Sequence, residues 1–297
     1  NRVDDQGKEY LFSDHIYFAN PYFMAYNRLS SDTKDRLIAS ADLKYNITPE
    51  LYVRLLTGTD LAYRFSTGIN PEGGAIATPS IGVGQRMDNE FNSQLQVGYD
   101  KVLSKAFTLN TFVGGNIMKS TYSNVSAGGS QFIVPGFYAV NNTKSLSRGY
   151  DKSEKEFNSL FGSVELGFNK YLFLSVTGRN DWFSTLNPNT NNIFYPSLGL
   201  RSVLSQSVQL PAWISYAKLR GAWAKTGSAA SVAPYSQALS YGFGNTYMGQ
   251  ATAYVSSGGI PNTLLQPAVT RSWEAGFDAK FLQNRIGVDF TVYNRLT

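Results

Sequence analysis

The sequence contains no cysteine and a single histidine, His15. A disulfide scaffold and a thiolate metal site are therefore excluded, and so is a histidine-rich metal cluster. A Ser-His-Asp triad would have to use His15, which lies in an aromatic strand pattern without a nucleophile elbow. We therefore expect neither enzyme activity nor a catalytic, cofactor or metal site.

Charged residues and long apolar runs are also scarce. Charged residues make up 16% of the chain, below the roughly 25% usual for soluble domains. No apolar run approaches the roughly 18 residues that a membrane-spanning helix requires, which excludes a helical membrane protein. The net charge is +5, but Lys and Arg are scattered at alternate positions rather than gathered in a stripe, so we expect no nucleic-acid partner.

Aromatic residues, by contrast, reach 14% of the chain, with nineteen each of tyrosine and phenylalanine. The segment 90–100 places Phe91, Leu95 and Val97 on one face of an extended chain and Gln94 and Gln96 on the other. This alternation predicts a strand with one apolar and one polar face. It recurs in segments about ten residues long, which is typical of a transmembrane antiparallel β-barrel.

The pattern predicts an all-β chain of about eleven strands, with short and long connections in strict alternation, since one rim of such a barrel carries tight turns and the other carries long loops. We expect a polar loop at residues 30–34 and long excursions over residues 119–154 and 227–270. The strands are expected near residues 16–26, 36–46, 51–63, 90–101, 107–117, 157–168, 172–178, 194–204, 215–225, 272–281 and 286–292.

Several blocks of this sequence resemble one family, the SusC/RagA-like TonB-dependent transporters of Bacteroidetes outer membranes. The resemblance runs from residue 20 to the end of the chain and is specific in combination, although each block alone is a generic barrel strand. Where proline commonly follows the STL motif in that family, this chain has Asn187, which bears on loop shape rather than on the fold. The blocks are NPYFMAYNRLSSDTKDRLIASADLKYNITPELYV, GRNDWFSTL, FYPSLGL, AKLRGAWAKTG and SWEAGFDAKFLQNRIGVDFTVYN.

The resemblance implies active import of a glycan or an oligopeptide through the outer membrane of a Gram-negative bacterium, with energy from the TonB complex. It also implies a SusD-like surface lipoprotein as a lid and a dimer of transporter–lid pairs in outer-membrane lipid. Similar transporters have barrels of about 22 strands around a plug domain. Residues 1–297 are then part of such a barrel, and we expect the plug, the segment that engages TonB and the remaining strands to be absent from this chain.

The block GRNDWFSTL contains the first candidate site, where Arg179, Asp181 and Trp182 lie at the point at which a strand leaves the membrane for a long loop. Arg179 and Asp181 could face the lumen and contact cargo or the plug, because charges on barrel strands avoid lipid. We favour a structural interpretation, in which these two side chains brace each other at the rim and Trp182 anchors at the membrane interface.

The second candidate site is the long loop 227–270, which contains no Asp, Glu, Lys or Arg. Uncharged aromatic and hydroxyl surface suits stacking on sugars or packing on a protein lid, and large loops on barrel rims commonly carry function. The alternative is a loop folded on its own barrel. The aromatic residues expected to contact cargo or lid are Tyr235, Tyr241, Phe243, Tyr247 and Tyr254.

Two alternatives from other classes remain open at this point. A passive porin-like channel would show the same strands, but without a plug domain. A soluble all-β binding or adhesion module could share the strand periodicity, although a β-sandwich does not usually sort its loops by length. The sequence does not discriminate between glycan and peptide cargo.

Overall fold

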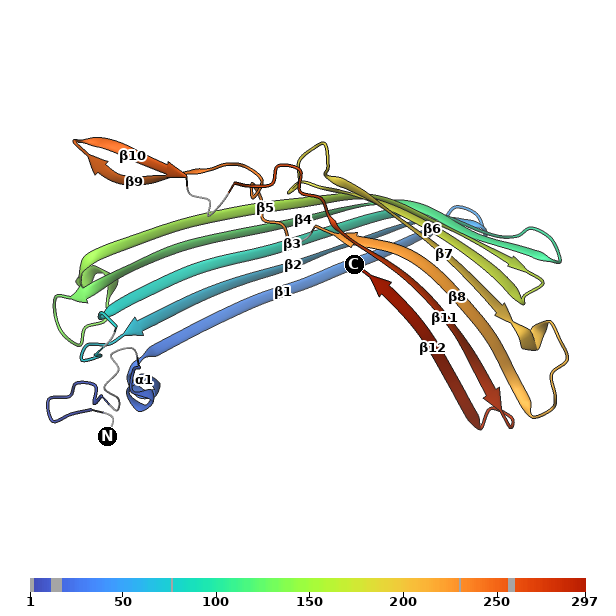
Figure 1. Cartoon of the computed structure of the whole chain (residues 1–297), viewed down its shortest axis with the longest axis horizontal. Coiled ribbons are helices and arrows are strands. Elements are labelled where there is room, and N and C mark those ends of the chain that lie inside the picture. Colours follow the sequence, from blue (N-terminus) through green and yellow to red (C-terminus); the bar gives the residue numbers. More distant parts are fainter. Residues whose placement is uncertain (1–2, 12–17, 76, 230, 256–259) are drawn as a thin grey trace. The chain divides into compact units, whose positions relative to one another are not determined.

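The computed structural model describes residues 3–11, 18–75, 77–229, 231–255 and 260–297, and it is almost entirely β-structure (Figure 1). One α-helix, α1 (Pro21–Asn27), precedes the strands, and two short 3-10 helices, η1 (Val140–Asn142) and η2 (Leu204–Gln206), lie between them. The strands are β1 (Leu29–Asn46), β2 (Leu51–Asn70), β3 (Ser80–Val102), β4 (Phe107–Phe132), β5 (Thr143–Phe168), β6 (Leu172–Phe183), β7 (Asn192–Val203), β8 (Ile214–Ser228), β9 (Tyr241–Tyr247), β10 (Gln250–Val255), β11 (Ala268–Phe281) and β12 (Ile286–Leu296).

Ten of these strands form one sheet, in the order β1-β2-β3-β4-β5-β6-β7-β8-β11-β12. Strands that follow each other in the chain are neighbours in the sheet, except that β8 pairs with β11 because β9 and β10 form a separate antiparallel hairpin. The predicted all-β antiparallel class is confirmed. The described residues contain twelve strands rather than about eleven, since the hairpin adds two strands inside the excursion expected to be a loop and a helix replaces the first expected strand.

The strand expected over residues 16–26 is wrong where the structure describes it, since residues 21–27 form α1. Pro21 stands in the first helical turn, where the missing N–H costs nothing, and the Asn20 side chain accepts hydrogen bonds from the N–H groups of Tyr22 and Phe23. These local signals outweigh the aromatic alternation. Residues 16 and 17, like His15, lie outside the described residues.

The polar segments expected to be loops are mostly strand. Residues 30–34 belong to β1, and most of residues 119–154 belong to β4 and β5, each 26 residues long, with only residues 133–142 connecting them. Ladder hydrogen bonds come from the backbone, so Ser, Thr and Asn do not end a strand that has neighbours. A membrane crossing needs only about 9–11 strand residues, and longer strands continue beyond the hydrocarbon region with polar side chains on both faces.

Short and long connections alternate along the sheet, with one exception. The tight connections are residues 47–50, 103–106, 169–171 and 282–285, and the long ones include residues 71–79, 133–142 and 229–267. The connection 204–213, which the alternation requires to be short, is longer than the connection 184–191 and contains η2. The predicted alternation is therefore correct as a trend but not strict.

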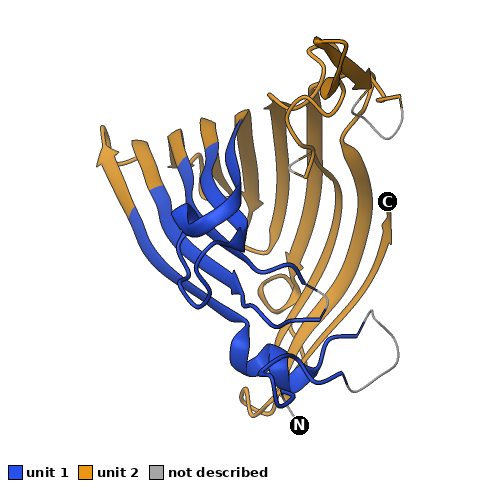
Figure 2. Cartoon of the chain, turned by 90° about the vertical axis from the view of Figure 1, so that its left-hand side faces the viewer, with its two compact units in different colours: residues 1–39, 59–91, 120–154 blue, residues 40–58, 92–119, 155–297 orange. Residues whose placement is uncertain are grey.

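The chain divides into two compact units, which are coloured in Figure 2. Unit 1 contains residues 1–39, 59–91 and 120–154, and unit 2 contains residues 40–58, 92–119 and 155–297. In unit 1 the buried Glu9 carboxylate accepts hydrogen bonds from the N–H groups of Asn20 and Ala75, the latter at 2.7 Å. The Glu9 N–H donates to the Gly73 carbonyl at 2.8 Å. Glu9 thereby fastens the segment before α1 to the connection between β2 and β3.

Candidate functional site

The strands of unit 2 have two chemically distinct faces. In the paired registers of β8, β11 and β12, Leu219 lies opposite Phe277, and Phe277 lies opposite Phe290. On the other face, Arg220 lies opposite Gly276, and Gly276 lies opposite Thr291. The same alternation continues through β7, β6 and β5. We call these the apolar face and the polar face of unit 2.

Large side chains on the apolar face are exposed rather than covered. Their exposed fractions are 49% for Leu219, 53% for Phe290, 45% for Val292 and 47% for Val176. A second sheet packed on this face would bury them, as the inner faces of a β-sandwich are buried. Among the helices that the structure describes, none is long and apolar enough to cross a membrane.

The block GRNDWFSTL separates its three predicted site residues between the two faces. Arg179 and Asp181 lie on the polar face, where Arg179 Nε donates to Asp181 Oδ1 at 2.6 Å and Arg179 Nη2 donates to Ser159 Oγ at 2.8 Å. The two charged residues therefore brace each other, as the structural interpretation of the sequence predicts. Asp181 is the more buried partner, with 15% of its side chain exposed.

Trp182 lies on the apolar face, directly opposite Asn158 and Asn192 in the two neighbouring strands. It lines a hollow of about 570 Å³ together with Leu95, Val113 and Leu160. The alternation of a strand sends adjacent residues to opposite faces, so Trp182 cannot share a lumen-facing site with Arg179 and Asp181. Its placement suits the interface anchor that the sequence suggests.

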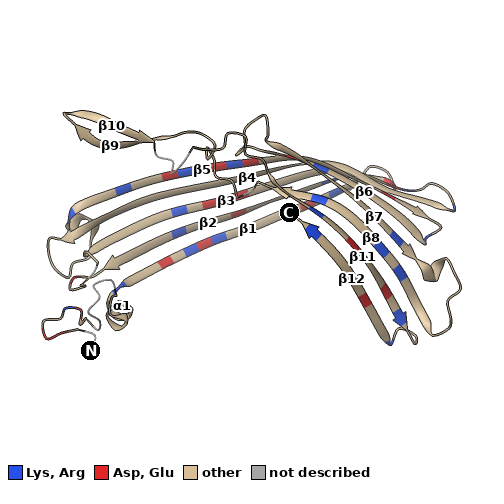
Figure 3. Ribbon diagram, in the orientation of Figure 1, with Lys and Arg blue, Asp and Glu red and all other residues tan. Residues whose placement is uncertain are grey.

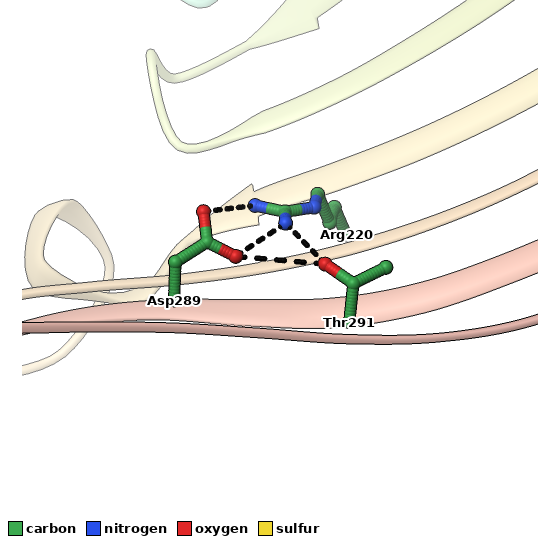
Figure 4. Close-up of polar contacts among 3 residues, drawn as sticks. All are labelled: Arg220, Asp289 and Thr291. Carbon is green, nitrogen blue, oxygen red and sulfur yellow. Dashed lines mark hydrogen bonds and ion pairs between the residues drawn. The ribbon is translucent and has the colours of Figure 1, made fainter.

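Two arginine networks on the polar face were not singled out by the sequence analysis. Arg201 on β7 donates through Nη2 to Glu165 Oε1 on β5 at 2.8 Å, and its guanidinium lies 4.3 Å from the centre of the Phe173 ring. Arg220 on β8 donates through Nη2 to Asp289 Oδ1 and to Thr291 Oγ1 on β12, both at 2.6 Å (Figure 4). Figure 3 shows charged residues along the strands. In the sequence, the signal for these two networks is an arginine at a polar position of the strand alternation.

The aromatic residues predicted in the long loop lie mainly on the β9–β10 hairpin. Tyr241, Phe243 and Tyr247 belong to β9, Tyr254 belongs to β10, and Tyr235 lies before the hairpin. All five are exposed, and Tyr254 packs across the hairpin against Gly242. The exposed fractions are 88% for Tyr235, 87% for Phe243, 68% for Tyr247, 66% for Tyr241 and 58% for Tyr254.

The base of the long loop, by contrast, is packed on unit 2. Phe183, Leu186, Ile193 and Ala229 form a buried cluster, against which further apolar side chains of the loop pack. Gln237 ties the loop to the connection between β6 and β7, because its Oε1 accepts from the Asn187 N–H at 3.0 Å and its Nε2 donates to the Thr185 carbonyl at 3.2 Å. The loop thus has an anchored base and an exposed hairpin.

The sequence from residue 2 to residue 296 matches the family model described as TonB dependent receptor-like, beta-barrel. The chain belongs to this family. Its strands are therefore those of a transmembrane antiparallel β-barrel, and the exposed apolar face described above is the face that such a barrel presents to lipid. The family consists of outer-membrane receptors and transporters of Gram-negative bacteria.

Solved structures agree with this membership at the level of fold. A structure of the RagAB peptide transporter has a TM-score of 0.81 at 18% identity, and the match covers 93% of this chain and 31% of that one. The RagAB peptide importer in its 'open-open' state gives 0.78 at 18% identity, again over 93% and 31% of the two chains. The siderophore receptor PiuA from Acinetobacter baumannii gives 0.54 at 11% identity, over 88% and 40%.

This chain spans about a third of the length of the RagAB chain that it matches. A search of curated proteins returned no match. The similarity to a SusC/RagA-like transporter that the sequence suggests is confirmed by the family match and by the RagAB fold.

Proposed function

We propose that this chain is part of the barrel of an outer-membrane transporter that imports a nutrient, either a glycan or an oligopeptide, with energy from the TonB system. The observation that supports this most is the pair of faces on the unit 2 strands, in a chain of the TonB-dependent receptor family. One face exposes Leu219 and Val292, which lipid would cover, and the other carries paired charges, which a lumen would hydrate.

The domain organisation follows from the same proposal. The chain spans 31% of the length of the RagAB transporter chain that it matches. We propose that a plug domain and further strands complete the barrel of the transporter. We propose that Arg179 and Asp181, which lie on the polar face near the end of β6, contact the plug or cargo. Because they already pair with each other, such a contact uses their remaining donors and acceptors.

We assign the exposed hairpin as the surface that contacts a SusD-like lipoprotein lid. Phe243 and Tyr247 expose large aromatic rings on a loop without any charged residue. The centres of protein interfaces are enriched in aromatic residues and depleted of charged residues. The lid would hold cargo over the barrel until the plug rearranges. We also propose that two such transporter–lid pairs form a dimer in a Bacteroidetes outer membrane.

The experiment uses the complete transporter in its native outer membrane. A β-barrel migrates faster on a gel before boiling than after, and uptake of cargo stops when the TonB complex is deleted. A passive porin-like channel would give the same gel shift but TonB-independent uptake, and a soluble β module would give neither. Binding of the purified transporter–lid pair to sugar and peptide libraries then identifies the cargo class.

A further inference from the structure

The apolar face of unit 2 carries two charged side chains, and these lie directly opposite each other. Lys225 on β8 pairs with Arg271 on β11 in the register of the two strands. At every other position of this face in the paired registers of β5 to β8, β11 and β12, the residue is uncharged. In the paired part of these strands, the charge that the barrel presents to lipid is therefore concentrated at one place. We call Lys225 and Arg271 the cation pair.

The cation pair lies near the ends of its two strands. Lys225 is three residues before the end of β8, and Arg271 is three residues after the start of β11, so both adjoin the connection 229–267. Long connections mark the outer rim of an outer-membrane barrel. Trp223 and Trp273 face each other two positions further into the membrane on the same face, with 42% and 49% of their surface exposed. Tryptophan is enriched at the membrane–water interface, which places the cation pair at the level of the lipid headgroups of the outer leaflet.

Neither member of the cation pair has an acidic partner in the described part of the chain. Lys225 is half-buried and Arg271 is exposed, and the side chain of neither forms an ion pair or a hydrogen bond with a described residue. The adjoining segment 227–270 contains no Asp or Glu, and Glu274, three residues after Arg271, lies on the polar face. Like charges directly opposite each other destabilise a sheet. An anion from outside the chain would remove this repulsion.

A lipid phosphate matches the chemistry of the cation pair and of its surroundings. Residues directly opposite each other in an antiparallel pair have Cβ atoms about 5 Å apart, so the two long side chains can reach the same anion. The planar guanidinium of an arginine donates two parallel hydrogen bonds to a phosphate, and a lysine adds a point charge. The acyl chains of a lipid would lie over Trp223, Trp273 and the apolar residues deeper in the membrane, whereas a free phosphate would gain nothing from them.

We propose that Lys225 and Arg271 bind the headgroup phosphate of an anionic lipid in the outer leaflet, with its acyl chains against Trp223 and Trp273. The inference goes beyond the import of a nutrient and does not depend on it, because it uses only the face that the barrel presents to lipid. The bound phosphate neutralises the repulsion between β8 and β11, the two strands from which the long loop leaves the sheet. The lipid thereby stabilises the base of that loop.

The test uses the complete transporter, purified in detergent, and measures bound lipid by native mass spectrometry. The probes are dioleoylphosphatidylglycerol, which is anionic, and dioleoylphosphatidylcholine, which has the same acyl chains and no net charge. We expect the anionic lipid to bind more tightly, by a ratio of dissociation constants that shrinks as salt is added. In the double variant Lys225→Gln, Arg271→Gln this ratio should fall roughly tenfold or more, because each basic residue near an anionic headgroup contributes to binding.

Further variants keep the result interpretable. The double variant Lys218→Gln, Lys280→Gln is the matched control, because it removes two positive charges from the same two strands on the polar face. It should leave the ratio unchanged, and so should Lys225→Arg, which retains the charge. The gel shift on boiling shows that each variant is folded. If the double variant of the cation pair does not fold, Lys225→Gln alone takes its place, with a smaller fall expected.

Equal binding of the two lipids by the wild-type transporter overturns the inference. An unchanged ratio in the variants of the cation pair also overturns it, as does an equal fall in the matched control, which would indicate a general effect of net charge. Inorganic phosphate in large excess should displace little of the anionic lipid, and complete displacement would overturn a lipid as the source of the phosphate. TonB-dependent uptake is a separate readout, so the lipid site can fail while the import function stands.

Discussion

On the polar face of unit 2, Arg201 on β7 lies directly opposite Arg220 on β8. Like charges in such a cross-strand pair destabilise a sheet. Each guanidinium points away from the other, toward a carboxylate on a strand two places away, Glu165 on β5 or Asp289 on β12. The two carboxylates thereby relieve the repulsion.

The path of Arg220 across β11 depends on Gly276. This residue lies between Arg220 and Thr291 in the register, and a Cβ there would be 2.6 Å from the Phe290 carbonyl and 3.2 Å from Arg220 Nε. We expect Gly276→Val to displace Arg220 and to lower the temperature of the gel shift, at a cost of about 1–3 kcal/mol from overpacking.

Gly287 provides the matched control for Gly276 in the same hairpin. Nothing lies within 4 Å of a Cβ built on Gly287. Gly287→Ala should therefore leave the transition temperature of the complete transporter nearly unchanged. If the Gly276→Val variant has the same transition temperature as the wild type, the Arg220 side chain does not depend on Gly276 to cross β11.

The long loop shows how elements far apart in sequence fix each other. The Asn187 N–H donates to Gln237, and Asn187 Nδ2 donates to the Thr263 carbonyl at 3.1 Å. Proline, which is common at this position in similar transporters, has no N–H and could not make the first of these bonds. Asn187, which stands where similar transporters commonly have proline, therefore makes contacts that hold the loop in place.

We predict that Asn187→Pro loosens the base of the long loop. Limited proteolysis of the complete transporter should cut between residues 229 and 267 several times faster, while the gel shift on boiling stays as in the wild type. Asn187→Ala keeps the N–H and loses two side-chain hydrogen bonds, the one to the Thr263 carbonyl and the one that its Oδ1 accepts from the Asn189 N–H, so it should be cut at an intermediate rate. Equal rates in the three proteins would contradict the anchoring role.

The β9–β10 hairpin gives a second prediction for an element. Phe243→Ser and Tyr247→Ser remove exposed rings, so the gel shift should not change, but the amount of lipoprotein lid recovered with the transporter should fall at least several-fold. Tyr150→Ser, at a tyrosine with 69% exposure on β5, is the control and should retain the lid. Undiminished lid recovery in both hairpin variants would refute the assigned contact surface.

For the whole molecule, the two faces of unit 2 predict opposite tolerance of charge. Leu219 and Ala222 lie on one strand and on opposite faces. Leu219→Lys places an ammonium in lipid and should cost about 2–4 kcal/mol near the bilayer midplane. Ala222→Lys faces the roomier polar side, beside Glu274 in the register, and should cost far less.

The readout for this pair is the folded fraction in bilayers at increasing urea, with the wild-type transporter alongside. Comparable losses in the two variants would mean that the apolar face does not meet lipid. The barrel assignment of the unit 2 strands would then have to be abandoned.

The sequence by itself determined the class of fold and most of its strands. Alternation of apolar and polar residues is a local property, and it placed all ten strands of the sheet, because a strand in lipid must put its polar residues on one side. It also identified the pair Arg179 and Asp181, whose spacing of two puts both on one face. Family resemblance supplied the transporter class.

Tertiary structure decided what alternation could not express. Strands β4 and β5 continued through polar sequence because neighbouring strands satisfy their backbones. Helix α1, by contrast, replaced an expected strand through local signals, Pro21 and the Asn20 cap, which the sequence itself carries. The contacts of Arg201 and Arg220 join strands that are not adjacent in the sheet. Pairs of that kind depend on the register of several strands at once, so only the assembled sheet could bring them together.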